Sequence, residues 1–179
     1  MNASNRKVHK FIGLVVSVQL LLWTISGIFF SFNKIDQIRG ENYLKSVEQI
    51  TSEKISKISF DEAKEIVIEK TFLKPISVEE ITEEKRGSEF RGRNLPLYKL
   101  SSLDSSDKEV NVYIDPSLGK IVAIRTFEWR LWDLMWGLHI MDWRDRDDIN
   151  NLLLKIFSIL ALISSITGII LFFRPKSKA

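Results

Sequence analysis

The sequence predicts an α+β membrane protein in which two transmembrane helices flank one extramembrane domain, a helix followed by a four-stranded antiparallel sheet. Two long uncharged runs lie near the ends of the chain, and every acidic residue lies between them. In that middle part the hydrophobic period changes from that of a helix to that of a strand. We expect the following segments along the chain: a tail at 1–10, a span at 11–32, a connector at 33–58, the domain at 59–126, a helix and turn at 127–150, a second span at 152–173 and a tail at 174–179.

The two uncharged runs are long enough to cross a membrane. Residues 11–32 form a run of 22 residues without a charge, and residues 156–173 form a second run of 18. As helices they reach roughly 33 and 27 Å, against a hydrocarbon core of about 30 Å. The first run is longer than the apolar part of a secretory signal peptide and no cleavage site of small residues follows it. We therefore expect an uncleaved anchor.

The charges flanking the spans predict the orientation. The two tails carry six basic residues and no acidic one, whereas the segment between the spans holds all 23 acidic residues of the chain. Basic flanks stay in the cytoplasm, so both termini are expected inside and the central domain outside the cytoplasmic membrane. The isoelectric point near 9.1 is then a sign of topology, and we expect a lipid bilayer as partner and no nucleic acid. The tail residues are Arg6, Lys7, Lys10, Arg174, Lys176 and Lys178.

The central domain is predicted to begin with a capped helix. Ser59 and Glu62 form a capping box, and Ala63, Ile66 and Val67 give the following residues an apolar stripe that ends before Pro75. Alternating residues then predict four strands, separated by turn residues at 86–87, 105–107 and 115–119. The expected strands are 76–81, 95–103, 110–114 and 121–124.

Residues 127–143 are predicted to form a helix with a tryptophan face. At 100° per residue, Trp129, Trp132, Trp136 and Trp143 fall within about 60° of one another. Tryptophan favours the headgroup layer, so we expect an amphipathic helix on the outer membrane surface. The alternative is that the stripe packs beneath the sheet as core.

Several short motifs along the chain resemble the PepSY-associated transmembrane family. The first span opens with RKVHKFIG at 6–13, and both spans carry an Ile-Ser/Thr-Gly-Ile motif, at 25–28 and 166–169. The segments 35–41 and 138–143 also look like that family. The middle of the chain is similar to a single PepSY domain, with its Phe-Asp-Glu-Ala helix start at 60–63 and Gly119-Lys120 before the last strand.

The resemblance implies two different functions. Larger members have four spans, and some act in the reduction of siderophore-bound iron with b-type haem held by histidines. Secreted PepSY domains are associated with inhibition of thermolysin-like peptidases, which implies a regulatory or partner-binding role. This chain has two spans, so a four-helix bundle would need a homodimer.

His9 and His139 are the only histidines of the chain and therefore the candidate haem ligands. They lie at opposite ends of the first span, roughly 33 Å apart, so one haem within a chain cannot use both. The alternatives are a basic juxtamembrane residue for His9 and an interfacial residue for His139. Haem b is therefore a candidate cofactor only if a second copy or a partner supplies the other ligand.

The remaining polar clusters predict no catalytic site or metal site. Asp142 and the acidic residues that follow it lack the closing glutamate of a calcium loop, so we expect a solvated turn. Cysteine is absent, and we find no nucleophile–base set and no phosphate-binding loop. We expect a non-enzymatic inner-membrane protein that binds an envelope partner, or alternatively a dimeric haem component of iron reduction.

Overall fold

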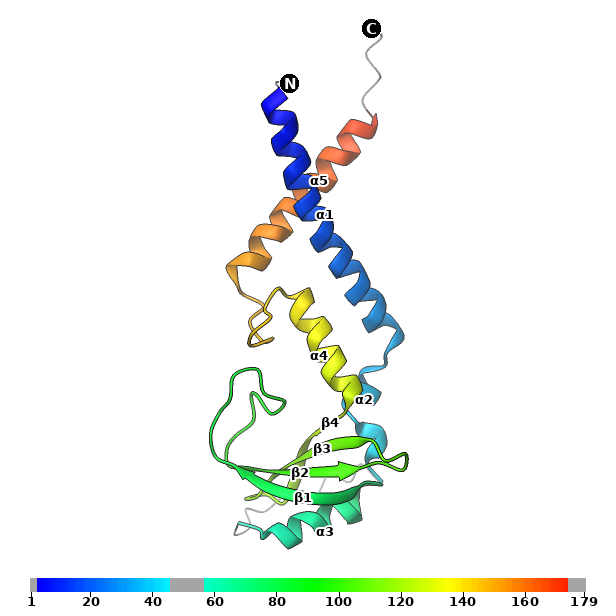
Figure 1. Ribbon diagram of the computed structural model, residues 1–179, viewed down its shortest axis with the longest axis vertical. Coiled ribbons are helices and arrows are strands. Elements are labelled where there is room, and N and C mark those ends of the chain that lie inside the picture. The colour runs from blue at the N-terminus through cyan, green and yellow to red at the C-terminus, as the bar shows by residue number, and fades with distance from the viewer. Residues whose placement is uncertain (1–2, 46–56, 174–179) are drawn as a thin grey trace. The chain divides into compact units, whose positions relative to one another are not determined.

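The computed structural model describes residues 3–45 and 57–173, with side chains described at 10–45 and 57–169. The chain divides into two compact units (Figure 1). The first unit comprises Met1–Phe29 and Met135–Ala179, and the second comprises Phe30–Leu134. The two predicted spans contribute to the first unit, and the sheet lies in the second.

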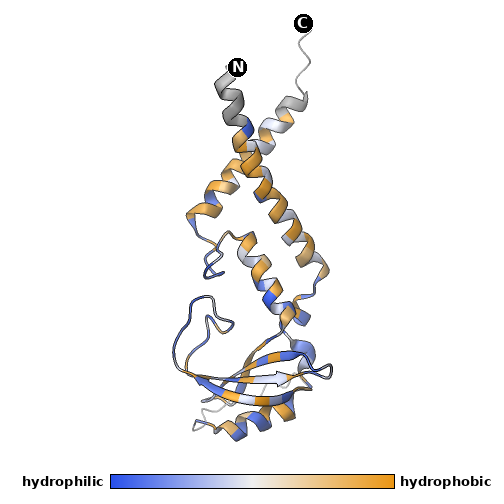
Figure 2. Cartoon of the chain, in the orientation of Figure 1, coloured by the Kyte–Doolittle hydropathy of each residue, from blue (hydrophilic) through white to orange (hydrophobic). Residues whose placement is uncertain are grey.

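The first unit contains two long apolar helices. Helix α1 runs over Ala3–Phe32 and helix α5 over Leu152–Phe173. Within them, Lys10–Phe32 and Leu152–Ile169 are apolar and long enough to cross a membrane, and the protein buries only 17% and 6% of these segments. Figure 2 shows hydrophobic residues around the circumference of both helices. Surface of this kind is stable only in lipid or against another apolar surface.

Helix α1 has one buried face, and it is partly polar. Val16, Gln19 and Ser26 are each at most 5% exposed, at spacings of three and seven residues that keep them on one side of the helix. Nε2 of Gln19 has no hydrogen-bond partner among the described residues. Burying an amide without a hydrogen bond inside an apolar span costs free energy. A polar group that approached this face of α1 would therefore be stabilised by bonding to Gln19.

The glycines of the spans do not make the contacts that their sequence positions suggest. Gly13, Gly27 and Gly168 are expected to let the two spans, or two copies, approach closely. A Cβ atom placed on any of the three would meet nothing within 4 Å. The expectation that these glycines allow a close approach of the two spans is therefore wrong within the chain. The buried positions of the spans include Val16, Ser26 and Ala161 instead.

The second unit begins with a connector and a capped helix. The connector contains a short helix α2 (Ile35–Ile38) and a 3₁₀ turn η1 (Glu41–Tyr43). Helix α3 spans Phe60–Lys70, and the predicted capping box is confirmed: the Ser59 hydroxyl accepts from the Glu62 N–H at 3.2 Å, and Glu62 accepts from the Ser59 N–H at 2.6 Å. The capping box thereby provides partners for N–H groups that have none within the helix.

Four strands form one antiparallel sheet in chain order, as the alternation of the sequence predicts. They are β1 (Lys74–Ile81), β2 (Leu97–Leu103), β3 (Glu109–Asp115) and β4 (Lys120–Arg125). In the register of β3 and β4, Tyr113 faces Ala123 and Ile114 faces Ile121. Val122 has no partner in this register and is therefore the extra residue of a β-bulge.

The sheet has a core on each face, and the bulge explains the distribution of β4 side chains between them. Ile121 and Ile124 pack with the helix α3 core, whereas Val122 and Ala123 pack on the opposite face. The second face is covered by the long loop 82–96 between β1 and β2, which rises from the side of the sheet away from α3 (Figure 1). Two consecutive residues share a face because the bulge interrupts the alternation of the strand.

Helix α4 precedes the second span, as predicted, but it is shorter than the tryptophan stripe requires. It covers Phe127–His139, and the chain then turns, with Met141 at φ 57°. Trp143 is therefore not on this helix, and the prediction of a four-tryptophan face is wrong at that position. Trp129 is 8% exposed within the second unit, which favours the core alternative for this residue.

Candidate functional site

His139, the last residue of α4, is held by the buried face of α1 within the first unit. Its Nδ1 atom lies 2.7 Å from the Ser26 hydroxyl oxygen, and its main-chain oxygen accepts a hydrogen bond from Trp23 Nε1 at 2.6 Å. The ring of Trp136 lies parallel to the imidazole, with centroids 6.4 Å apart. Three contacts from two helices thus fix the position and orientation of this histidine.

Ser26 is a side-chain hydrogen-bond partner of the His139 imidazole. The Ser26 hydroxyl donates to the main-chain oxygen of Leu22 at 2.8 Å, as is usual for serine in an apolar helix. With its proton used in this way, the Ser26 oxygen can accept a hydrogen bond from a protonated Nδ1 of His139. Burial lowers the pKa of His139, which favours the neutral form of the imidazole.

The other predicted histidine is far from this cluster. His9 lies on the same helix as Ser26, 17 residues earlier, which corresponds to roughly 26 Å along the axis. Its side chain is outside the described side chains. The structure therefore does not bring His9 and His139 together.

The acidic segment after α4 forms a turn around one carboxylate. Asp142 accepts hydrogen bonds from the backbone N–H groups of Arg144, Asp145, Asp147 and Asp148 at 3.1–3.3 Å. Among the described residues, no group of three or more side chains is arranged to hold a metal ion. The turn packs against α4, where a Cβ atom at Gly137 would lie 3.0 Å from the Asp142 main-chain oxygen.

Acid should open this turn. Burial alone would raise the pKa of Asp142, but the four N–H donors favour the charged form more strongly and bring the pKa down to about 2. A carboxyl whose folded pKa is depressed stabilises the turn above its unfolded pKa of about 3.9 and loses that contribution as the pH falls. We expect amide hydrogen exchange at 144–148, corrected for intrinsic rates, to lose protection between about pH 4 and pH 2. Asp142→Asn should already show the loss at pH 6; equal protection in both proteins would contradict this role.

In the second unit, Glu89 ties the loop 82–96 to the sheet and to α4. Its carboxylate accepts from Asn111 Nδ2 at 2.9 Å, from the Tyr113 hydroxyl at 3.1 Å and from Arg130 Nε at 2.5 Å. Burial opposes ionisation, but these donors lower the pKa of Glu89 below its usual range. Arg125 adds a hydrogen bond from Nε to the Glu89 main-chain oxygen at 2.9 Å.

Arginines surround Trp129 next to this network. The Arg125 guanidinium lies 4.2 Å from the centre of the indole, and the Arg91 guanidinium lies 5.6 Å from it while pairing with Asp133. Burial, and then the charge of Arg93, lower the pKa of Arg125 to about 10. The site is therefore crowded with positive charge around an aromatic platform.

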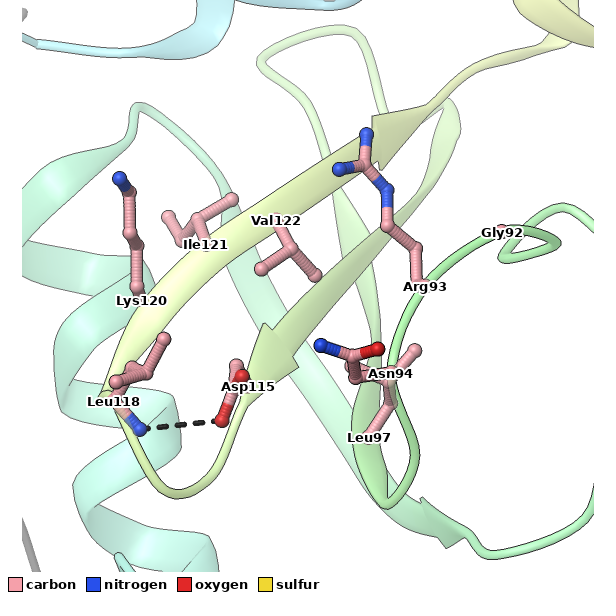
Figure 3. Close-up of a pocket in the computed structure, with 9 residues that line it drawn as sticks. All are labelled: Gly92, Arg93, Asn94, Leu97, Asp115, Leu118, Lys120, Ile121 and Val122. Carbon is pink, nitrogen blue, oxygen red and sulfur yellow. Dashed lines mark hydrogen bonds between the residues drawn. The ribbon is translucent and has the colours of Figure 1, made fainter. Parts of the chain in front are cut away.

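Two adjoining cavities, of about 370 and 460 Å³, follow strand β4. Both have Arg93, Ile121 and Val122 in their walls. Figure 3 shows the first of them, with Arg93 reaching from the loop toward β4 and Lys120 at the start of the strand. The second ends at Arg39, Arg125 and Trp129. We call the two together the β4 groove.

The sequence alone did not indicate this groove. Arg39, Arg93 and Arg125 are separated by 54 and 32 residues in the chain, and no motif around any of them distinguishes it from an ordinary surface arginine. The partnership of Ser26 with His139 was missed as well, although both lie in the motifs that carry the family resemblance. A polar residue inside an otherwise apolar span was the available signal.

The sequence model of the PepSY-associated TM region family matches residues 6–179, nearly the whole chain. Neither a curated protein nor a solved structure matches it.

Proposed function

Because the chain belongs to the PepSY-associated TM region family, we propose that it is a membrane-anchored binding protein with no catalytic site of its own. In this proposal the sheet domain binds a partner protein of the envelope on the outer side of the cytoplasmic membrane. The β4 groove is the observation that carries the proposal. It combines cavities large enough for side chains of a partner with the outer edge of β4, which pairs with no strand among the described residues.

Photocrosslinking in native cells tests partner binding. A photoreactive phenylalanine analogue at Lys120, in the groove, should give a discrete crosslinked product, and the same analogue at Ile68, exposed on α3, probes the opposite face of the sheet. A partner band from any face of the domain supports the binding function. Absence of a crosslink from positions on all faces would contradict it.

The orientation is a separate part of the proposal. The six basic residues of the tails favour the cytoplasm, and residues 33–155, between the two uncharged runs, have a net charge of −3, from 20 basic and 23 acidic residues. Reporter fusions after Ala179 and between Ser105 and Ser106 should therefore report opposite sides of the membrane. The same side for both would refute the topology.

Haem binding, with the protein as a dimeric component of iron reduction, is the second candidate. His139 would be the ligand from this chain, and the Ser26 hydroxyl, 2.7 Å from its Nδ1, would orient the imidazole as second partners of ligating histidines commonly do. Neither cavity of the β4 groove includes His139. A haem held there would supply one-electron chemistry, and another copy or a partner would provide a further ligand. His9 is the corresponding candidate at the other membrane face.

An absorption spectrum decides between these functions. If haem binds at His139, protein purified after expression with ample haem shows a Soret band that His139→Ala reduces, while His9→Ala removes only the share held at the other face. Ser26→Ala should shift the midpoint potential of the His139 haem, whereas Ser17→Ala, at an exposed position of the same helix, should not. A colourless wild-type protein would end the haem candidate and leave the binding function standing.

A further inference from the structure

We propose that the β4 groove binds an extended acidic polypeptide segment, which adds to the sheet as a fifth strand beside β4. This inference rests on the proposed binding function and names the chemistry of its partner. Three features of the second unit support it: the open edge of β4, the wall that closes one end of that edge, and the charges that line it.

The outer edge of β4 is available for main-chain pairing. The strand order β1-β2-β3-β4 leaves β4 with a neighbour on one side only. No backbone hydrogen bond joins residues 120–125 to any segment other than β3 within the described parts of the chain. An edge strand of this kind presents N–H and C=O groups that another extended chain can pair with.

The connector closes the groove at one end. Gly40 has φ 75°, and a Cβ atom there would lie 2.7 Å from Cγ2 of Ile124, so only glycine lets the connector pass this close to the strand. This close passage places Arg39 and Glu41 beside the end of β4. The open part of the edge therefore runs from Lys120 to Ala123 and ends at a wall that carries arginine.

The charge of the groove is positive and includes cations without a carboxylate partner. Its walls contain four basic and two acidic side chains, and one of the acids, Asp115, already accepts hydrogen bonds from the Ser117 and Leu118 N–H groups at 2.8 and 3.2 Å. Among residues 3–45 and 57–173, no carboxylate forms an ion pair with Arg39 or Arg93. Carboxylates of a bound segment would reduce the repulsion between these cations and bind them through charge-assisted hydrogen bonds.

The bulge at Val122 and the charge of Lys120 also suit the opposite interpretation, because natural edge strands use both devices to prevent pairing. A protected edge, however, needs neither a concave surface nor arginines at its closed end. The cavities and the charge therefore favour a binding edge, and the two interpretations differ in a measurable way.

Fluorescence anisotropy with the full-length protein in nanodiscs tests the proposal. The probe is a labelled peptide of about six residues with alternating threonine and glutamate. A lysine-for-glutamate version and a version N-methylated at alternate residues are its controls. We expect saturable binding of the acidic peptide, no binding of the lysine version, and binding at least about tenfold weaker after N-methylation, since that removes ladder donors.

Matched variants locate the site. Arg39→Gln with Arg93→Gln should weaken binding by about tenfold, whereas Lys74→Gln with Lys85→Gln, which removes two exposed cations elsewhere in the unit, should leave it unchanged. The chain has no cysteine, so Lys120→Cys introduces a single thiol that should form a disulfide with a cysteine-bearing acidic peptide. Phe72→Cys, at an exposed position outside the groove, should not.

The outcomes separate this inference from the proposed function. If neither the peptide nor its variants bind, or if N-methylation has no effect, strand addition is wrong and β4 is a protected edge or a simple anion site. Full displacement of the peptide by inorganic phosphate, or by vesicles of anionic lipid at physiological salt, would also overturn it. Crosslinks to a partner in cells from the α3 face alone would leave the binding function intact while this inference fails.

Discussion

Glu89→Ala should detach the loop between β1 and β2 from the sheet and lower the free energy of unfolding of the second unit by about 2–3 kcal/mol. The Glu89 carboxylate is the common acceptor for three donors, on β3 and α4, and its side chain is 23% exposed. Removing this acceptor leaves its donors unsatisfied. Each unsatisfied donor that is fully buried costs about 1–3 kcal/mol of stability. Solvent can reach part of this site, so the sum over three donors is smaller than three full penalties.

Limited trypsin digestion measures this effect directly. The loop contains Lys85, Arg86, Arg91 and Arg93, and release from the sheet should speed cleavage there. Glu84→Ala, which removes an exposed carboxylate from the same loop, is the control and should leave the cleavage rate unchanged. Cleavage in Glu89→Ala at the wild-type rate would show that the network does not hold the loop.

The same network has a predicted pH dependence. The pKa of Glu89 is lowered in the folded protein, so its contribution is present above the unfolded pKa of about 4.3 and lost as the pH falls below it. Cleavage of the loop by an acid-tolerant protease should therefore accelerate below about pH 4 in the wild type, beyond any acceleration in Glu89→Ala.

Leu100→Ala is expected to have the largest effect on folding, a loss of about 2–5 kcal/mol in the free energy of unfolding of the second unit. Leu100 is fully buried in the centre of β2, where it faces Val78 on β1 and Val112 on β3 and belongs to the core beneath α3. Truncation removes buried methyl groups and leaves a cavity. Strand β2 is hydrogen-bonded to a strand on each side, so it cannot shift to fill this cavity. A typical domain has only about 5–15 kcal/mol of stability in total.

Urea unfolding of the second unit, followed by circular dichroism, tests this expectation. The midpoint for Leu100→Ala should fall without a change in slope, since the surface exposed on unfolding stays similar. Ile76→Ala removes a similar volume at a position on β1 that is 61% exposed and should shift the midpoint little. Equal midpoints for the two variants would show that Leu100 is not a core residue.

Local patterns in the sequence determined most of the fold. The uncharged runs predicted α1 and α5, the Ser59–Glu62 pair predicted the start of α3, and period-two alternation predicted all four strands. Each of these signals depends on residues close together in the chain, whose spacing fixes the face on which a side chain lies. The same motifs indicated the family, which the match over residues 6–179 confirms.

Only the tertiary structure decided what the polar side chains contact. Sequence spacing extended the tryptophan helix to Trp143, but the chain turns after His139, where Asp142 collects four backbone N–H groups. Likewise, Ser26 and His139 are 113 residues apart and meet at 2.7 Å. The arginines of the β4 groove also come from separate loops and strands. Contacts between distant residues carry no periodic signal, because they depend on how elements pack rather than on the geometry of any one element.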